Sequence, residues 1–296
     1  MENTGVGWAD DSWGPWWGCH KISEECQFCY ACLEDVFYSK GVSHFDTHIL
    51  RPRRFFGEAH WKQPLAFNRA AERTGRRRQV FCASMCDVLE RLPVEHPSYA
   101  GVEEARARMW ELVEQTPWLD WMLCTKRPEE FQNFLPKHWL QTPRPNVWLI
   151  TTIGLQKHMQ RVRELMAIPA VVHGVSCEPL LGLVVLPDYF LKSSRAWVIT
   201  GGESGNHKGV RPSKIDHFRA LRDQAVSANC FFHFKQWGQH NSDGVKCRSK
   251  HEAGRELDGR TWDERPVEGL KPGITAEDYY AVRKPVKEKI DVYRWW

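Results

Sequence analysis

Long hydrophobic runs are missing from this 296-residue chain. No stretch approaches the roughly 20 uninterrupted apolar residues that a membrane-spanning helix needs, and no basic segment near the start leads into an apolar run, as in a secretory signal. The chain also lacks a large excess of charge of one sign, because it has 41 basic and 37 acidic side chains. We therefore expect a cytoplasmic globular protein without membrane contact, whose net charge leaves a nucleic-acid partner open.

Cysteine is too rare for a disulfide scaffold, with ten residues in the chain. Its distribution is uneven, since four of the ten fall between Cys19 and Cys32. In a chain without an export signal, such clustering indicates metal or redox chemistry.

Short apolar runs rich in β-branched and aromatic residues recur along the chain, separated by segments long enough for helices. This alternation is typical of a parallel sheet built from βαβ units. Apolar stripes predict helices over 102–113 and 215–225. We expect strands near residues 16–18, 79–83, 121–124, 147–152, 171–176, 196–200 and 230–234.

Nearly every expected strand ends in a polar or Gly-rich segment, and βα barrels place their active sites at these carboxyl ends. The sequence favours an α/β fold with a partial (β/α)6 TIM-type barrel over residues 1–240; a doubly wound open sheet is the alternative. Residues 241–296 are charged and Gly-containing, which predicts a C-terminal extension packed on the barrel. The side chains that we expect at the mouth include Lys126, Arg127, Lys235 and Gln236.

The loop over residues 19–32 has the spacing C-x6-C-x2-C, followed by one more C-x2-C step. Closely spaced thiolates of this kind hold iron–sulfur clusters. Zinc is an alternative, although structural zinc usually draws on two separated pairs; free structural thiols are another. If only Cys19, Cys26 and Cys29 bind a [4Fe-4S] cluster, one iron stays open to a small molecule. Cys32 as a fourth ligand would close the site and favour electron transfer.

With one iron open, this loop resembles that of the radical S-adenosylmethionine (radical SAM) superfamily, where three cysteines after the first barrel strand hold the cluster. Phe28, just before the third Cys, is part of the resemblance, whereas the six-residue first gap replaces the usual three. The resemblance implies a [4Fe-4S] cluster and S-adenosyl-L-methionine as cofactors and an external one-electron reductant. It also implies a 5′-deoxyadenosyl radical that abstracts hydrogen from the substrate.

A closer resemblance, over residues 5–266, is to a phage and bacterial family of three-Cys-motif proteins with radical SAM character. This chain departs from the family at 151–154, where a Ser followed by an acidic residue is typical, and at Cys86, where Ser is common. By analogy with phage enzymes, it implies a nucleobase in DNA as substrate, for example rearrangement of a hypermodified thymine. The matching segments are 5–10, 13–15, 18–19, 26–31, 84–87, 125–128, 176–182, 201–205, 234–238 and 257–262.

The resemblance to the superfamily implies that residues after the second strand bind the amino group of the cofactor's methionine part. A carboxylate such as Asp87 suits that ammonium group through a charge-assisted hydrogen bond. Capping of the following helix is the alternative role for Asp87. The Gly-rich segment 201–205 predicts a backbone that contacts a ligand closely. A plain turn is the alternative interpretation. The candidate metal ligands are Cys19, Cys26 and Cys29. The candidate cofactor-binding residues are Ser84, Met85, Asp87, Thr152, Glu178, Gly201, Gly202, Glu203 and Ser204.

Basic and aromatic residues alternate before the second strand, a pattern that fits phosphate contacts combined with base stacking. A solvated charged face is the alternative interpretation. Two functions other than a radical enzyme therefore stay open: a zinc-stapled nucleic-acid-binding module without catalysis, and a four-Cys electron-transfer protein. The residues of this pattern are Arg51, Arg53, Arg54, His60, Trp61 and the run 76–78.

Overall fold

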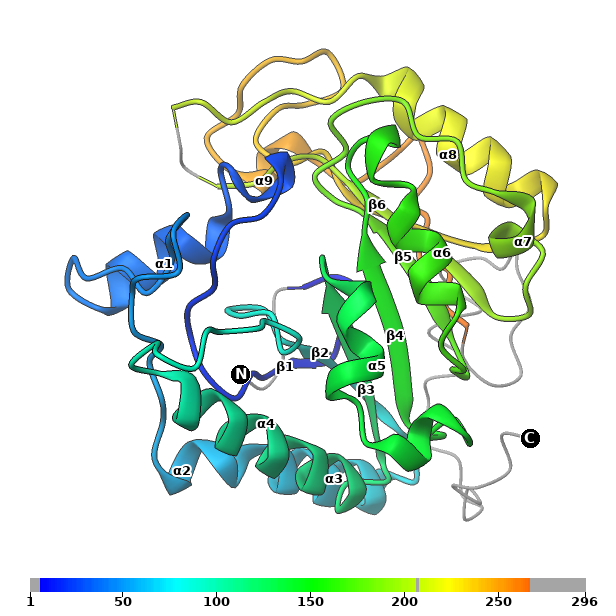
Figure 1. Cartoon of the computed structure of the whole chain (residues 1–296). Coiled ribbons are helices and arrows are strands. Elements are labelled where there is room, and N and C mark those ends of the chain that lie inside the picture. The colour runs from blue at the N-terminus through cyan, green and yellow to red at the C-terminus, as the bar shows by residue number, and fades with distance from the viewer. Residues whose placement is uncertain (1–5, 206–207, 267–296) are drawn as a thin grey trace.

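Seven parallel strands, hydrogen-bonded in chain order, form the centre of the computed structural model, which describes residues 6–205 and 208–266. The sheet curls into a half barrel (Figure 1). This arrangement confirms the predicted α/β fold with a partial barrel. The strands are β1 (Asp11–Ser12), β2 (Arg78–Cys82), β3 (Leu119–Thr125), β4 (Val147–Thr152), β5 (His173–Cys177), β6 (Ala196–Gly201) and β7 (Phe231–Gln236).

The first strand differs from the prediction. It consists of Asp11–Ser12, which pair with Val80 and Phe81 of β2, whereas the predicted strand 16–18 only bridges to Arg54 through Trp17. A two-residue strand that begins with a carboxylate has no apolar alternation for a sequence pattern to detect. The sheet therefore has seven strands where six βα units were expected, and the other six strand predictions fall on β2–β7.

Helices cover the outer face of the sheet, with α3 and α4 below β1–β3 and α6–α8 beside β4–β6 (Figure 1). The two predicted helices correspond to α4 and α8. The helices are α1 (Tyr30–Tyr38), α2 (Glu58–Trp61), α3 (Gln63–Thr74), α4 (Tyr99–Glu114), α5 (Phe131–Phe134), α6 (Gln160–Met166), α7 (Asp188–Leu191), α8 (Ile215–Ser227) and α9 (Lys250–Ala253), with 3-10 turns η1 (Glu24–Cys26), η2 (Pro128–Glu130), η3 (Lys137–Leu140) and η4 (Gln156–His158). Within the described ranges, none of them combines the length and apolar character that crossing a bilayer requires.

The inner face of the sheet changes character along each strand. In β4, alternate residues point to the same face, and the series runs from Trp148 and Ile150, which belong to an apolar inner cluster, to Thr152, which lines a cavity. Trp197 of β6 packs edge-on against Trp148, with ring centroids 5.9 Å apart. Large side chains therefore close the amino-terminal end of the half barrel and leave the carboxyl end open for a site.

Part of the predicted C-terminal extension packs on the barrel. Ala253 and Leu257 belong to the main core cluster, and the Trp262 ring meets Phe232 of β7 at 5.6 Å. Residues 267–296 of this extension lie outside the described residues.

We predict that Leu221→Ala lowers the free energy of unfolding by about 2–5 kcal/mol, because it removes a fully buried side chain of α8 from the core. Val226→Ala on the same helix, where the side chain is 54% exposed, should cost less than about 1 kcal/mol. Urea unfolding monitored by tryptophan fluorescence compares the two. Equal losses in both variants would show that α8 does not pack through its Leu221 face.

Candidate active site

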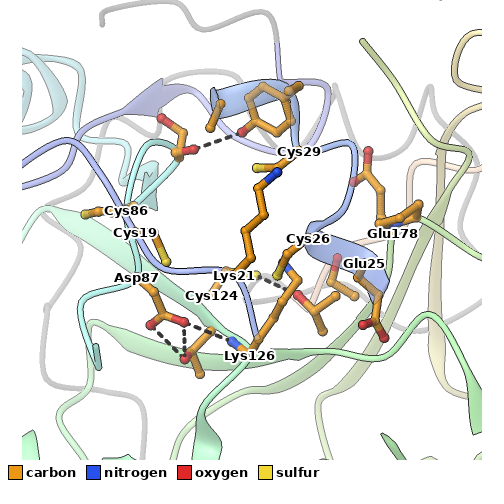
Figure 2. A pocket seen from close by; sticks show the side chains of 18 of the residues that line it. Cys19, Lys21, Glu25, Cys26, Cys29, Cys86, Asp87, Cys124, Lys126 and Glu178 are labelled. Atoms are coloured by element: carbon orange, nitrogen blue, oxygen red, sulfur yellow. Dashed lines mark hydrogen bonds between the residues drawn. The ribbon is translucent and has the colours of Figure 1, made fainter. Parts of the chain in front are cut away.

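A cavity of about 1040 Å³, including its open mouth, lies at the carboxyl ends of the strands. Trp8 and Phe81 contribute to its apolar lining, and Cys124 and Thr152 contribute from β3 and β4. Figure 2 shows Cys19, Cys26 and Cys29 arranged around this hollow, with Lys21 and Lys126 between them. The three predicted metal ligands therefore meet in one cavity.

Backbone contacts fix the course of the cysteine loop. Gly18 donates its N–H to the carbonyl of Met85 at 3.0 Å and has φ +112, and a Cβ there would lie 2.5 Å from the carbonyl oxygen of His44. Only glycine tolerates both conditions. Farther along, η1 presents Cys26, and the buried Glu25 carboxylate accepts the N–H of Gly154 at 2.9 Å. The loop is thereby attached to the ends of β2 and β4.

Two cations face the three thiols. Arg127 Nη1 lies 3.7 Å from Cys19 Sγ; burial raises the pKa of Cys19, and the guanidinium charge opposes that rise. Burial also opposes ionisation of Cys26, but the Lys126 ammonium and hydrogen bonds around Ser23 lower the pKa of this thiol below its ordinary value. Burial likewise raises the pKa of Cys29, and Lys126 opposes that rise. Positive charge beside thiols favours the thiolate, the metal-ligating form, and here it outweighs burial at Cys26 alone of the three.

The spacing of the thiols distinguishes between metal groups. A single tetrahedral zinc, with Zn–S bonds of about 2.3 Å, needs sulfur atoms about 3.8 Å apart. Across residues 6–205 and 208–266, the three-residue set with donor atoms within 4.8 Å of one another is Glu24, Glu25 and His158, not a set of cysteines. The three loop thiols therefore share a cavity without all lying within that distance of one another, which is wider than one tetrahedral ion requires.

A buried network supports the cysteine loop from behind. Arg127 donates to Asp87 Oδ2 at 2.8 Å and to the His20 carbonyl at 2.8 Å. The backbone N–H of His20 donates to Glu90 Oε1 at 2.7 Å. Glu90, which is fully buried, also pairs with Arg53 through bonds of 2.8 and 2.9 Å. His20, which follows Cys19, is therefore held between Arg127 from the loop after β3 and Glu90 from the loop after β2.

Seven of the nine predicted cofactor residues line the cavity, and Met85 and Gly201 do not. Met85 packs against Ala31 and Phe45 instead. Gly201 lies beside the Glu178 carboxyl carbon, 3.3 Å from where its Cβ would be. The seven that line the cavity are Ser84, Asp87, Thr152, Glu178, Gly202, Glu203 and Ser204.

Two predicted carboxylates already have partners within the chain. Asp87 accepts hydrogen bonds from Thr125 at 2.8 Å, Leu89 N at 3.1 Å and Arg127 at 2.8 Å. Glu203 accepts from the backbone N–H of Arg211 at 2.8 Å and from its guanidinium. Both carboxylates therefore hold the walls of the cavity in position.

Glu178 keeps more capacity for a ligand. Its Oε1 accepts from Lys235 Nζ at 2.7 Å and from Gln236 Nε2 at 3.4 Å, which leaves Oε2 for another donor. Lys126 and Arg127 also line the cavity, as expected for strand-end residues, and Gln236 lies buried beside it.

Cys32 does not line the cavity. It sits in the first turn of α1, with its sulfur 3.8 Å from Ser43 Oγ. Cys86 and Cys124 line the cavity in addition to the three loop cysteines.

Several basic residues of the predicted nucleic-acid pattern have structural partners instead. Arg53 pairs with Glu90, Arg77 with Asp120, and Arg78 with Asp11 at 2.7 Å. Trp61 is buried beneath the Arg108 guanidinium, which lies 4.4 Å from the ring centroid. Arg51 is exposed, whereas Arg54 and Arg76 are partly buried, with Arg76 lying 3.8 Å from Asp10.

Sequence reasoning missed the parts of the site that depend on distant partners. Glu90 and His20 are 70 residues apart, and neither belongs to a spaced motif. Tyr30, which donates its hydroxyl to the Ser84 carbonyl at 3.2 Å, could have been noticed because it follows Cys29 directly. No local signal identifies Glu90.

We predict that Glu90→Gln destabilises the protein by about 3–5 kcal/mol at pH 7, because the buried Arg53 loses its charged partner. Burial opposes ionisation of Glu90, but hydrogen bonds from His20 and Arg53 lower its pKa to about 2. Since its pKa is about 4.3 when unfolded, its contribution is full above that pH and is lost as the pH falls toward 2. Urea unfolding between pH 7 and 3 should show the two stabilities converging below about pH 4; a constant difference would contradict the pairing.

Comparison with known proteins gives one family and no function. No curated protein and no solved structure matches the chain. A family model matches residues 3–266, close to the range over which the sequence resemblance runs, and its description states no activity. The chain belongs to the family described as "Protein of unknown function (DUF5131)".

Proposed function

We propose that this protein is a radical SAM enzyme in which Cys19, Cys26 and Cys29 hold a [4Fe-4S] cluster. One observation carries the proposal. The three thiols line a single cavity at the carboxyl ends of a parallel half barrel, with spacing too wide for one ion. Lys126 and Arg127 add positive charge that suits an anionic thiolate cluster. On this proposal the half barrel is of the radical SAM kind.

When bound, the cluster would supply one electron to S-adenosylmethionine, whose adenosyl part would then take a hydrogen atom from the substrate. The chain's own residues provide the enclosure that such chemistry needs. Trp8 and Phe81 give the cavity apolar surface. Gly202 lets β6 approach the backbone after β7, since a Cβ there would lie 1.9 Å from the Trp237 carbonyl oxygen. The glycine therefore allows the two strand ends that form this wall of the cavity to pack against each other.

The free polar groups of the cavity indicate how the cofactor would be oriented. Glu178 Oε2 is the carboxylate oxygen that suits an ammonium group, in place of the engaged Asp87 and Glu203. Lys126 suits the cofactor's carboxylate. Ser84 and Ser204 also line the cavity, and their hydroxyls have no hydrogen-bond partner among the described residues.

The two alternative functions receive less support. A zinc-stapled module would need sulfur atoms close enough for one ion, and no set of cysteines in the described ranges meets the 4.8 Å limit. A four-Cys electron carrier would need Cys32 inside the cavity, whereas its sulfur lies toward Ser43.

For the substrate we propose a nucleobase in DNA, with rearrangement of a hypermodified thymine as the specific isomerase reaction. This step rests on the resemblance to phage proteins and on no residue of the cavity. The reductant would be an external one-electron donor.

Anaerobic reconstitution tests the cluster and the enzyme class together. We expect brown wild-type protein with about four iron atoms per chain, and 5′-deoxyadenosine by mass spectrometry after addition of dithionite and S-adenosylmethionine. Cys32→Ala should retain both signals, because Cys32 lies outside the cavity. The triple variant Cys19→Ala, Cys26→Ala, Cys29→Ala should lose both.

Three results would contradict the proposal. Colourless wild-type protein containing zinc would favour the zinc module. Loss of iron in Cys32→Ala would favour the four-Cys carrier. Equal 5′-deoxyadenosine from the triple variant would remove the loop from the reaction.

Arg127 gives a second prediction, because hydrogen bonds and positive charge near cluster sulfurs raise a reduction potential. A hydrogen bond to a charged group contributes about 1.5–3 kcal/mol, and a tenfold change in a one-electron equilibrium is about 59 mV. We therefore expect Arg127→Leu to shift the midpoint by about 60–130 mV to more negative values. Arg127→Lys should shift it less.

An EPR-monitored redox titration measures the midpoint. Arg91→Leu is the matched control, since this exposed guanidinium pairs with Glu130 instead of a cysteine. A midpoint unchanged in Arg127→Leu would mean that this guanidinium does not act on the cluster.

A further inference from the structure

A run of contacting aromatic rings lies at the surface beside α1. Trp17 packs against Tyr38 and Phe56, with ring centroids 5.9 and 5.5 Å apart. The Arg54 guanidinium lies over both Trp17 and Phe56, at 4.9 and 5.4 Å. Phe37 meets Tyr38 edge-on at 5.2 Å. We call these five side chains, Trp17, Phe37, Tyr38, Arg54 and Phe56, the stacking surface.

The outer rings of the stacking surface are open to solvent. Phe37 is 78% exposed and Tyr38 is 57% exposed. Large aromatic rings held in place by neighbours, yet left uncovered, mark a binding surface more often than isolated exposed residues do. Trp17 packs against Tyr38, and Tyr38 against Phe37, so a ligand would meet rings that already contact one another.

Three cations lie on the chain segments that carry the stacking surface: Arg54 over the rings, Lys40 two residues after Tyr38, and Arg51 three residues before Arg54. Lys40, Arg51 and Arg54 have no ion-pair partner in the part of the chain that the structure describes. The carboxylate of Asp46 accepts hydrogen bonds from the backbone N–H groups of residues 49–51. Glu34, on the same helix as Phe37, is close enough to Lys250 to feel its charge. The cations beside the rings therefore remain available to an anion.

A second groove runs along α1 beside the stacking surface, and Tyr30 separates it from the cysteine cavity. Tyr30, Leu33, Glu34, Phe37 and Tyr38 of α1 line this groove together with Gly205. Tyr30 also lines the cavity itself. A chain-like ligand lying on the exposed rings would thus extend toward the cavity along one face of α1.

We propose that the stacking surface binds single-stranded nucleic acid, with bases on Phe37 and Tyr38 and phosphates near Lys40, Arg51 and Arg54. Aromatic platforms flanked by cations bind single strands because every base has a face to stack. A protein partner would not need unpaired cations around the rings, and duplex DNA keeps its bases stacked inside. Passage of one base beyond Tyr30 into the cavity rests on the proposed function; binding of the strand does not.

The test is fluorescence anisotropy with a labelled single-stranded DNA of about 15 nucleotides, against the full chain without S-adenosylmethionine. Phe37→Ala with Tyr38→Ala should weaken binding about 10- to 100-fold at constant salt, given the usual effect of removing a stacked ring. Lys40→Glu with Arg51→Glu should also weaken it and flatten the dependence on salt. Tyr189→Ala with Lys214→Glu, an exposed aromatic and a cation on other elements, should bind as the wild type does.

Four outcomes would overturn the proposal: no binding by the wild type at low salt, equal binding by wild type and both stacking-surface variants, equal loss in the control variant, or tighter binding of the matching duplex. If light scattering shows that the wild type is a dimer and that Phe37→Ala with Tyr38→Ala is a monomer, the rings bind a second copy of the chain instead. The cysteine triple variant keeps the stacking surface, so it should bind the strand even if it makes no 5′-deoxyadenosine. The two proposals can therefore fail separately.

Discussion

The pairing of Glu90 with Arg53 and His20 is the interaction on which the geometry of the site depends. Removing charged groups from water is costly unless each finds a partner, and this cluster meets that condition by joining a turn after β2 to two separate loops. Arg127 extends it to Asp87 and then to Cys19. A buried charge that loses its partner destabilises the fold strongly. Each ion pair in this cluster therefore restrains the position of the side chains that it joins. The first cysteine is therefore placed by electrostatics from outside its own loop.

The sheet supplies the other constraint, through the direction of its side chains. Parallel strands bring all their carboxyl ends to one edge of the sheet. Side chains alternate between the two faces of each strand, so the inward-facing residues of neighbouring strands change from apolar to polar at the same level. In β3 the inner residues run from Met122 to Cys124, and in β4 from Ile150 to Thr152. The bulky half closes the barrel and the polar half lines the cavity. A site at the other end would have to displace the contacting rings of Trp148 and Trp197.

How far the sequence predicts this molecule depends on the distance between interacting residues. The cysteine spacing and the polar strand ends are local patterns, and they located the cavity and most of its lining. Asp87 and Glu203 line that cavity, but Arg127 and Arg211 engage their oxygens. A linear pattern cannot say which partner a carboxylate takes. Arg53 was interpreted as a surface cation for the same reason. The strand at Asp11–Ser12 was missed because pairing with β2, and not its own composition, makes it a strand.

Helix α1 carries residues of both the cavity and the stacking surface. Cys29 is the residue that caps this helix, and Tyr30 is its first residue. Residues three, four and seven positions apart share one helix face, so Tyr30, Leu33, Glu34 and Phe37 form a continuous line. At about 1.5 Å per residue this line is roughly 10 Å long. The segment that presents a thiol to the cavity thus also carries the exposed ring of Phe37, and a polymer held at that ring lies within two or three nucleotide steps of the cysteines.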